Sequence, residues 1–248
     1  MARAAVLRRL TWKLGTVVGI VDETARVKSL FLEVGEWPGH RAGQHVDVRL
    51  TAEDGYQAQR SYSIASPPEE ERVALTIERI PDGEVSPYLV EELRPGDLLE
   101  LRGPIGGYFV WDVSMGGPLL LVAGGSGVVP LMAMIRHRSA AGTGVPSRLL
   151  YSARSLDDVI YRSELDRLAR AGDGLEVVYT LTRAQPPGWT GYSRRVDAAM
   201  LEEVAGGERA DVFVCGPTPF VEAAASALVS LGHEPRRIRT ERFGPTGG

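Results

Sequence analysis

Short hydrophobic runs that alternate with polar residues fill the first part of the chain, from residue 11 to about residue 102. Turn-forming segments such as EWPGH, AEDG, ASPP and RPGD separate these runs. A period of two is typical of strands that bury one face, and strands at this spacing favour a small antiparallel barrel or sandwich. The expected strands are GTVVGIV, SLFLEV, QHVDVRL, SYSIA, VALTIERI and DLLELR, and one helix is expected at VSPYLVEEL.

The pattern changes at Pro118, where the continuous apolar run PLLLVA leads through glycines into the helical pattern VVPLMAMIRHRSAA. Four further strand-like runs follow, SRLLYSA, LEVVYTLT, DVFVC and RIRTERF, and helical segments of about ten residues separate them. Such alternation predicts parallel βαβ units and a doubly wound sheet. We therefore expect two domains, an antiparallel β-barrel over residues 1–114 and a parallel α/β domain over residues 115–248, with a hinge near VSMGG.

Composition and charge exclude several classes of protein. The net charge of −4 over 248 residues argues against a dedicated nucleic-acid binder. The single cysteine, Cys215, excludes a disulfide framework and an iron–sulfur cluster held by this chain alone. No run approaches the roughly 18 apolar residues of a membrane span, and the basic start MARAAVLRRLTWKLG lacks the apolar region of a signal peptide. We expect a reduced, cytoplasmic enzyme.

A glycine-rich turn, VAGGSGVVP at residues 122–130, closes the first strand of the expected α/β domain and opens a helix. Gly124, Gly125 and Gly127 allow a close approach of the backbone, and the helix start offers free N–H groups and a positive dipole end to a pyrophosphate. Glycine-rich turns also occur without any ligand. By itself the motif leaves nucleotide binding and plain turn chemistry equally open.

The second strand of this domain ends in YSARS, where a bound dinucleotide places its ribose. An acidic residue there would favour a free 2′-hydroxyl, whereas Ser152 and Arg154 favour a 2′-phosphate, which an arginine can hold with a bidentate fork. Arg183, at the end of the third strand, is a second candidate. The alternative is that these arginines are solvated and paired with Asp157 or Asp158. We expect NADP, with NAD still open.

Cysteine and histidine give no further chemistry from their positions. Cys215 stands beside the turn residues Gly216 and Pro217, and a lone cysteine there is more often a small buried hydrophobe than a reactive group. The four histidines, at positions 40, 45, 137 and 233, show no metal-ligand spacing. No metal site is expected.

The segment QAQRSYSIASPP concentrates polar chemistry on an expected strand. In an extended segment Arg60 and Tyr62 point to one face, and Ser61 and Ser63 to the other. An ordinary surface edge strand would carry the same residues.

Two other segments of the first domain favour phosphate binding. DGEVS places Gly83 and Ser86 near a helix start, and GPIGGYF follows the last barrel strand with three glycines. Two phosphate-type helix starts in one chain would be explained by two nucleotides.

Seven of these motifs form one ordered series: RSYS, DGEVS, GPIGGYF, AGGSGVVP, YSAR, CGPTPF and a terminal ERF. In this order and at these intervals, the chain resembles the ferredoxin–NADP reductase superfamily of flavoprotein oxidoreductases over essentially its whole length. The resemblance implies a flavin-binding barrel followed by a nucleotide-binding α/β domain. It departs from the family pattern at Asp82, where relatives often have a first glycine.

The resemblance also implies roles for the residues of the flavin site. Arg60 would bind the flavin pyrophosphate, Tyr62 would stack on the isoalloxazine ring, and Ser63 would hydrogen-bond the reactive N5, with Ser61 in the same motif. The other flavin contacts would come from Ile77, Arg79, Gly83, Val85, Ser86 and Phe243.

On the dinucleotide side, the resemblance places Cys215 near nicotinamide C4 and makes Glu241 the active-site carboxylate. Together with Ser63, these two residues are the expected catalytic positions. The dinucleotide itself would be bound by Gly124, Gly125, Gly127, Ser152, Arg154, Arg183, Cys215, Gly216 and Pro217.

The implied function is a flavoprotein that takes hydride from NADPH onto FAD and passes electrons to a separate acceptor, a ferredoxin or an oxygenase component. FAD is preferred to FMN because GEVS and GPIGGYF extend the site past the first phosphate. No ferredoxin-like cysteine set is present, so the acceptor is expected on another protein. Two alternatives remain: a reductase of free flavin, a ferric chelate or a quinone, and an electron-transfer subunit that does not use NADPH directly.

Overall fold

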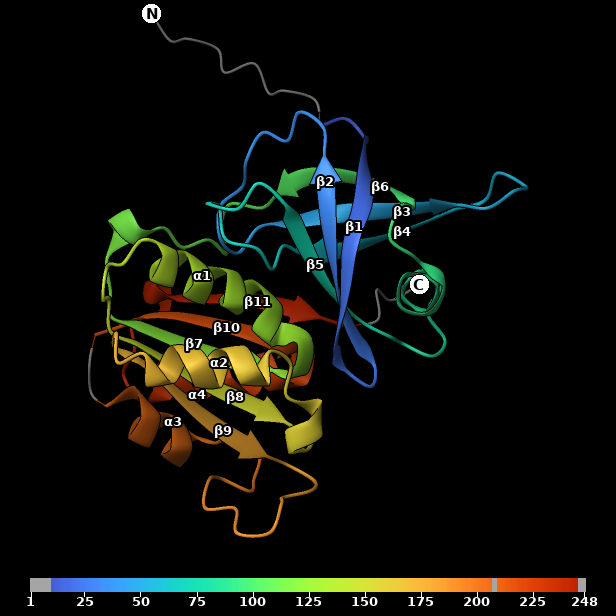
Figure 1. The fold of residues 1–248 in the computed structure, drawn as a ribbon. Helices are drawn as coiled ribbons and strands as arrows, with labels where there is room; N and C mark the ends of the chain where they lie inside the picture. Colours follow the sequence, from blue (N-terminus) through green and yellow to red (C-terminus); the bar gives the residue numbers. More distant parts are fainter. Residues whose placement is uncertain (1–9, 207–208, 245–248) are drawn as a thin grey trace, which may run out of the picture.

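The computed structural model describes residues 10–206 and 209–244, which form two sheets that lie side by side (Figure 1). The first sheet comes from the N-terminal half of the chain and the second from the C-terminal half. Most of the basic N-terminal arm expected from the sequence, residues 1–9, lies outside the described residues. The boundary between residues 114 and 115 stays a prediction.

Six antiparallel strands build the first domain in the order β4-β3-β6-β1-β2-β5. The strands are β1 (Lys13–Thr24), β2 (Val27–Val34), β3 (His45–Thr51), β4 (Gln57–Ser63), β5 (Val73–Glu78) and β6 (Leu98–Ile105). The two edges of the sheet meet where Ile64 bridges Leu75 and the Ala65 amide donates to the Ala74 carbonyl at 2.7 Å. The sheet therefore closes into the predicted barrel, which removes its free edges.

The helix expected at residues 85–93 is present, with helical residues at positions 86–92. Its last five residues form the π-helix Tyr88–Glu92, and Pro87 precedes them in the helical conformation. Leu93 is already extended, with ψ of 139°, and Pro95 follows soon after. Leu89 and Val90 are buried, so this segment caps the barrel.

The second domain is the predicted doubly wound parallel sheet, and its strands lie in the order β11-β10-β7-β8-β9. Its strands are β7 (Leu119–Gly124), β8 (Ser147–Ala153), β9 (Leu175–Leu181), β10 (Asp211–Pro217) and β11 (Ile238–Phe243). The helices are α1 (Val128–Ala140), α2 (Arg162–Arg170), α3 (Ala198–Ala205) and α4 (Thr218–Ser230). Every residue of β7 is buried, because helices cover both faces of the sheet.

The two faces of this sheet have separate hydrophobic cores. Residues of α1 and α2 pack with alternate side chains of β7 such as Leu121, whereas α3 and α4 pack with the intervening ones such as Leu120. The chain changes faces between β9 and β10, so β7 and β10 lie together at the topological switch point. In open α/β sheets the carboxyl ends of the strands at that point bind ligands.

Helix α1 joins the two domains through polar contacts. Arg136 donates to the Ala65 carbonyl at 2.8 Å and pairs with Glu164 at 2.6 Å. The neighbouring His137 lies 2.6 Å from Glu69 of the barrel. These contacts hold the end of β4 beside the α/β domain.

Among the described residues, no helix has the length and apolarity that a membrane crossing requires.

Candidate functional site

The RSYS segment lies on β4, where its side chains alternate as expected. Arg60 pairs with Glu84 at 2.8 Å, and Tyr62 packs against the barrel core. Burial raises the pKa of Tyr62, so its ring keeps the phenolic proton. On the other face, Ser61 donates a hydrogen bond to Asp47 at 2.7 Å.

Ser63 ends β4 and is the buried member of the segment, with 5% of its surface exposed. Its hydroxyl has no hydrogen-bond partner among the described residues. A buried polar group without a partner costs about 1–3 kcal/mol. This unsatisfied donor fits the hydroxyl role that the resemblance gives to Ser63 at the flavin N5.

Cys215 and Glu241 lie opposite each other on the paired strands β10 and β11. One carboxylate oxygen of Glu241, Oε2, is buried and unpartnered within the described residues, and burial raises the pKa of this carboxyl to about 7. Cys215 is fully buried, and burial together with the Glu241 charge raises the pKa of the thiol. The thiol is therefore neutral at physiological pH, which excludes it as an ionised nucleophile.

His45 is a site residue that the sequence reasoning missed. It lies directly opposite Ser63 in the β3–β4 ladder, so both side chains project to the same face. Its Nδ1 is 4.0 Å from Oε1 of Glu241, and burial lowers its pKa. The sequence places no histidine as a metal ligand or as an activator of Cys215, and it carries no signal that the start of β3 meets the last strand of the other domain.

The DGEVS segment places its polar groups beside the β4 arginine. The Ser86 hydroxyl accepts from the Ile80 amide at 3.0 Å and keeps its own proton to donate. Val85 is 1% exposed in the barrel core, so only its backbone is left for a ligand. Glu84, the carboxylate between Gly83 and Val85, was not singled out from the sequence. It accepts hydrogen bonds from both Arg60 and Tyr56.

Two other predicted flavin contacts lie on or just after β5. Ile77 is fully buried in the barrel core. Arg79 pairs with Glu91 of the π-helix at 2.5 Å. That ion pair ties the guanidinium of Arg79 to its own domain.

The glycine turn after β7 has the geometry that the motif requires. Gly125 has φ of +56°, a backbone conformation that favours glycine, and its side faces open space. A Cβ at Gly127 would collide with the Cys215 carbonyl oxygen, and one at Gly124 would lie 2.8 Å from the Phe220 ring. The turn therefore packs tightly against β10 and α4 on one side and stays open on the other.

A cavity of about 240 Å³ lies at this turn, between the barrel and the carboxyl ends of the parallel strands. It unites many of the residues predicted for the dinucleotide. The barrel domain lines the cavity with Arg26 and Glu78, and the α/β domain lines it with Gly124, Gly125, Ser152, Arg154, Asp158, Pro217 and Phe243.

Arg154 and Arg183 lie on neighbouring strand ends, where the Arg183 amide donates to the Arg154 carbonyl at 2.8 Å. Arg154 lines the cavity, whereas Arg183 is exposed just beyond the lining residue Thr182. In the described parts of the chain neither arginine pairs with Asp157 or Asp158. Asp158 lies 3.5 Å from Arg26 instead.

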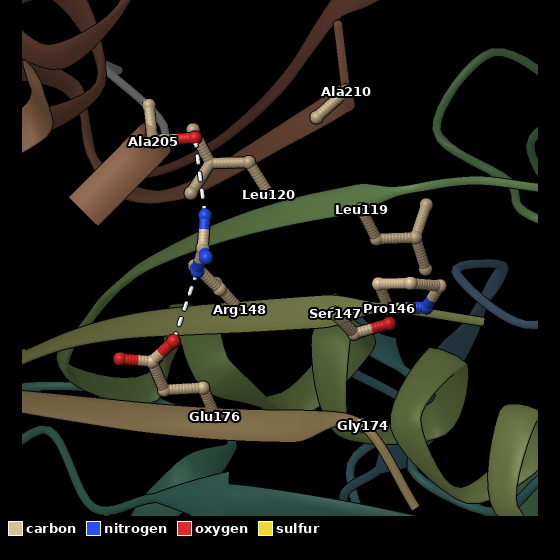
Figure 2. A pocket seen from close by; sticks show the side chains of 9 residues that line it. All are labelled: Leu119, Leu120, Pro146, Ser147, Arg148, Gly174, Glu176, Ala205 and Ala210. Carbon is tan, nitrogen blue, oxygen red and sulfur yellow. Dashed lines mark hydrogen bonds and ion pairs between the residues drawn. The ribbon is translucent and has the colours of Figure 1, made fainter. Parts of the chain in front are cut away.

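A second, smaller hollow of about 90 Å³ lies at the opposite, amino-end edge of the sheet (Figure 2). Its polar centre is Arg148, which donates to Glu176 at 2.9 Å and to the Ala205 carbonyl at 3.2 Å. The remaining lining is largely backbone and small apolar side chains. The guanidinium of Arg148 thus finds its hydrogen-bond acceptors within the chain itself.

Comparisons with known proteins agree with this geometry. Residues 25–110 match the family described as "Oxidoreductase FAD-binding domain", and residues 121–226 match "Oxidoreductase NAD-binding domain". The chain is 36% identical over 229 residues to a protein named ferredoxin–NADP reductase B from Sorangium cellulosum, covering 89% of each. It therefore belongs to the ferredoxin–NADP reductase superfamily, with one domain of the FAD-binding family and one of the NAD-binding family.

Two other similar proteins are longer than this chain. It is 33% identical over 236 residues to the glycine betaine monooxygenase reductase subunit of Pseudomonas aeruginosa, covering 92% of this chain and 63% of that protein. A solved structure of a cytochrome P450 reductase from Amycolatopsis superposes with a TM-score of 0.83 at 28% identity, over 96% of this chain and 71% of that one. The chain thus spans less than two thirds of the first of these relatives.

Proposed function

We propose that this protein takes hydride from NADPH onto FAD and passes the electrons to a separate protein, a ferredoxin-type carrier or an oxygenase component. The observation that carries the proposal is the cavity between the domains. It brings the glycine turn and Arg154 within one hollow, beside the domain that carries Ser63. The single cysteine is buried and reduced, which favours work in the cytoplasm.

When bound, FAD supplies the redox chemistry, accepting two electrons with a hydride and releasing them singly. In the proposal, the residues of the chain orient it: Arg60 and the Ser86 hydroxyl hold its phosphates, and Tyr62 packs on its ring. The Ser63 hydroxyl would donate to N5 and would thereby gain the hydrogen-bond partner that it lacks among the described residues. Positioning of this kind supplies much of the rate of a hydride transfer.

Glu241 and His45 form the polar wall beside Ser63. The carboxyl of Glu241 titrates near pH 7, so it can hold or release a proton at Oε2 under physiological conditions. Neutral Cys215 lies beside Glu241 on the neighbouring strand β10 and brings no charge to the site. In the proposal, this wall excludes water from the place where the nicotinamide lies.

The preference for NADPH rests on charge at the ends of β8 and β9. Arg154 lines the cavity and no carboxylate of the described residues pairs with its guanidinium. Ser152 precedes it on the same strand end. The guanidinium of Arg154 can donate two parallel hydrogen bonds to the 2′-phosphate of NADPH. NADH has a 2′-hydroxyl in that place, which cannot accept this bidentate pair.

A protein acceptor is supported by what the similar proteins are named. One is called a monooxygenase reductase subunit and one a ferredoxin–NADP reductase. The chain spans only 63% of the monooxygenase reductase subunit. The electron acceptor of this protein is therefore inferred only from the part that the two proteins share.

An anaerobic spectral titration tests the proposal. Flavin-loaded protein is titrated with NADPH and, separately, with NADH, and the bleaching of the flavin band is followed. We expect NADPH to bleach it at far lower concentration. The reduced protein is then mixed with an oxidised ferredoxin, free FMN or ferric citrate; fast reoxidation by ferredoxin alone supports the protein acceptor. Equal bleaching by both nucleotides would contradict the NADPH preference, and faster reoxidation by a small molecule would contradict the acceptor.

A further inference from the structure

Arg26 lies in the turn between β1 and β2, and it lines the part of the cavity that the barrel domain forms. Figure 1 shows the β1–β2 hairpin in the barrel domain. The backbone of Arg26 is held on both sides. Its carbonyl accepts from the Arg79 amide at 2.8 Å, and its amide donates to the Thr24 hydroxyl at 3.3 Å. The side chain therefore starts from a fixed point and reaches across the domain boundary.

The guanidinium of Arg26 is only loosely paired. A single nitrogen, Nη2, lies 3.8 Å from Glu78 of its own domain and 3.5 Å from Asp158 of the other. In contrast, Arg49 forms a two-pronged pair with Glu100 at 2.7 and 2.9 Å. Arg26 thus keeps most of its five donors for another acceptor.

Asp158 places Arg26 near the end of β8. It lies in the short 3₁₀ helix Leu156–Asp158, which begins two residues after Arg154, and its Oδ2 accepts from the Ser155 hydroxyl at 2.6 Å. Arg26 therefore meets the segment that carries the expected 2′-phosphate ligand, and it does so from the opposite domain. Both arginines line the same cavity.

We propose that Arg26 is a second ligand of the NADPH 2′-phosphate, and that this phosphate replaces Asp158 as its partner. A phosphate offers more charge and three acceptor oxygens, so it competes well with a single carboxylate at 3.5 Å. The bound nucleotide then links Arg154 of one domain to Arg26 of the other. This inference rests on the proposed use of NADPH.

A consequence for selectivity follows. Without a 2′-phosphate, Arg26 stays with Asp158 and Glu78, and NADH gains nothing from it. Asp158 competes with the phosphate for Arg26 and repels it. Removing the Asp158 charge therefore tightens the binding of 2′-phosphorylated nucleotides, whereas removing the Arg26 charge weakens it.

The test is calorimetric titration of the flavin-loaded protein with 2′,5′-ADP and with 5′-ADP at one ionic strength. The variants are Arg26→Ala, Arg26→Lys, Asp158→Asn and Arg154→Ala. Arg72→Ala is the matched control, since Arg72 pairs with Glu33 at 3.3 Å on the exposed barrel surface and its loss changes the net charge equally. Flavin content and thermal midpoint are measured for each variant to verify folding.

We expect Arg26→Ala to weaken 2′,5′-ADP about tenfold, as a lost charged hydrogen bond does, and to leave 5′-ADP unchanged. Asp158→Asn should tighten 2′,5′-ADP a few-fold, Arg26→Lys should lie between wild type and Arg26→Ala, and Arg72→Ala should match wild type. If Arg154→Ala weakens the binding of 2′,5′-ADP and Arg26→Ala does not, the inference about Arg26 is overturned while the proposed use of NADPH stands. Equal weakening of both ligands by Arg26→Ala also overturns it. If wild type binds both ligands equally, the NADPH proposal fails first.

Discussion

The two edges of the parallel sheet each carry a hollow, and they differ in which groups are left unsatisfied. At the amino-end edge, Arg148 gives its donors to Glu176 and to the Ala205 carbonyl (Figure 2). At the carboxyl-end edge, Arg154 has no carboxylate partner among the described residues, and Ser63 keeps a buried, unpaired hydroxyl nearby in the barrel. The polar groups at the amino-end hollow are therefore paired within the chain, whereas those near the carboxyl-end hollow are left to bind ligands.

The direction of the strands explains this difference. The strands β7 to β10 are each followed along the chain by a helix whose first N–H groups face the carboxyl-end edge, where they attract anions. The amino-end edge receives helix C-termini, whose carbonyls attract cations such as Arg148. The Ala205 carbonyl that accepts from Arg148 is the last residue of α3.

The largest effect is expected from breaking the packing of the glycine turn. Gly127→Ala should lower the free energy of unfolding by about 3 kcal/mol, because its Cβ would collide with the backbone of Cys215. Gly125→Ala, where the side is open, should cost only about 1 kcal/mol through its positive φ. Urea unfolding measures both; equal losses would contradict the tight packing at Gly127.

The next largest effect is expected from removing the arginine at the carboxyl-end edge, and none is expected from removing the arginine at the amino-end edge. Arg154→Ala should raise KM for NADPH roughly 10- to 100-fold, since charged hydrogen bonds of about 1.5–3 kcal/mol are lost, while KM for NADH hardly changes. Arg148→Ala, at the amino-end edge, should leave both values unchanged. Steady-state kinetics with the two nucleotides gives the comparison, and equal effects of Arg154→Ala on both would mean that the 2′-phosphate binds elsewhere.

Glu241 should make stability depend on pH. Its folded pKa of about 7 lies above the ordinary 4.5, so the folded state binds the extra proton and stability falls as the pH rises from about 4.5 to 7. Glu241→Gln removes this loss, which amounts to about 2.5 kcal/mol between pH 5 and pH 8. Unfolding of flavin-free protein at pH 5 and pH 8 should show a smaller pH difference in the variant. An identical pH difference in both proteins would mean that Glu241 has an ordinary pKa.

The smallest effect is expected from Glu84, whose carboxylate forms an ion pair with Arg60 in the flavin-free chain. Glu84→Gln should tighten FAD binding two- to threefold, because the pyrophosphate no longer competes with a carboxylate. Glu53→Gln, on the exposed β3–β4 hairpin, is the charge control. Fluorescence titration of flavin-free protein measures both affinities. Weaker FAD binding in Glu84→Gln would show that the carboxylate helps to hold the flavin.

Much of this architecture could be predicted from the sequence, because alternation and helical periodicity record which side chains face the core. The buried run of β7 and the alternating runs of the barrel were found in this way. The helix expected at residues 85–93 was found as well, and it ends at Glu92 because the backbone of Leu93 is extended.

The site was only half accessible to the same reasoning. Motifs mark residues that are neighbours along the chain, such as Ser63 within RSYS or Gly125 within its turn. His45 beside Glu241 and Arg26 beside Asp158 are contacts between domains. Neither pair lies within one motif, so only the folded chain brings their side chains together.

The central claim is that the unsatisfied groups near the carboxyl-end edge belong to the cofactors, and Ser63 tests it most directly. Stopped-flow reduction by NADPH would compare Ser63→Ala with Ser147→Ala, a buried serine at the amino-end edge whose hydroxyl donates to the Val145 carbonyl at 3.0 Å. We predict that both variants bind FAD fully and that only Ser63→Ala reduces it more slowly, by about 10- to 100-fold. If Ser63→Ala is reduced at the wild-type rate, Ser63 has no part in the hydride transfer and the account is contradicted.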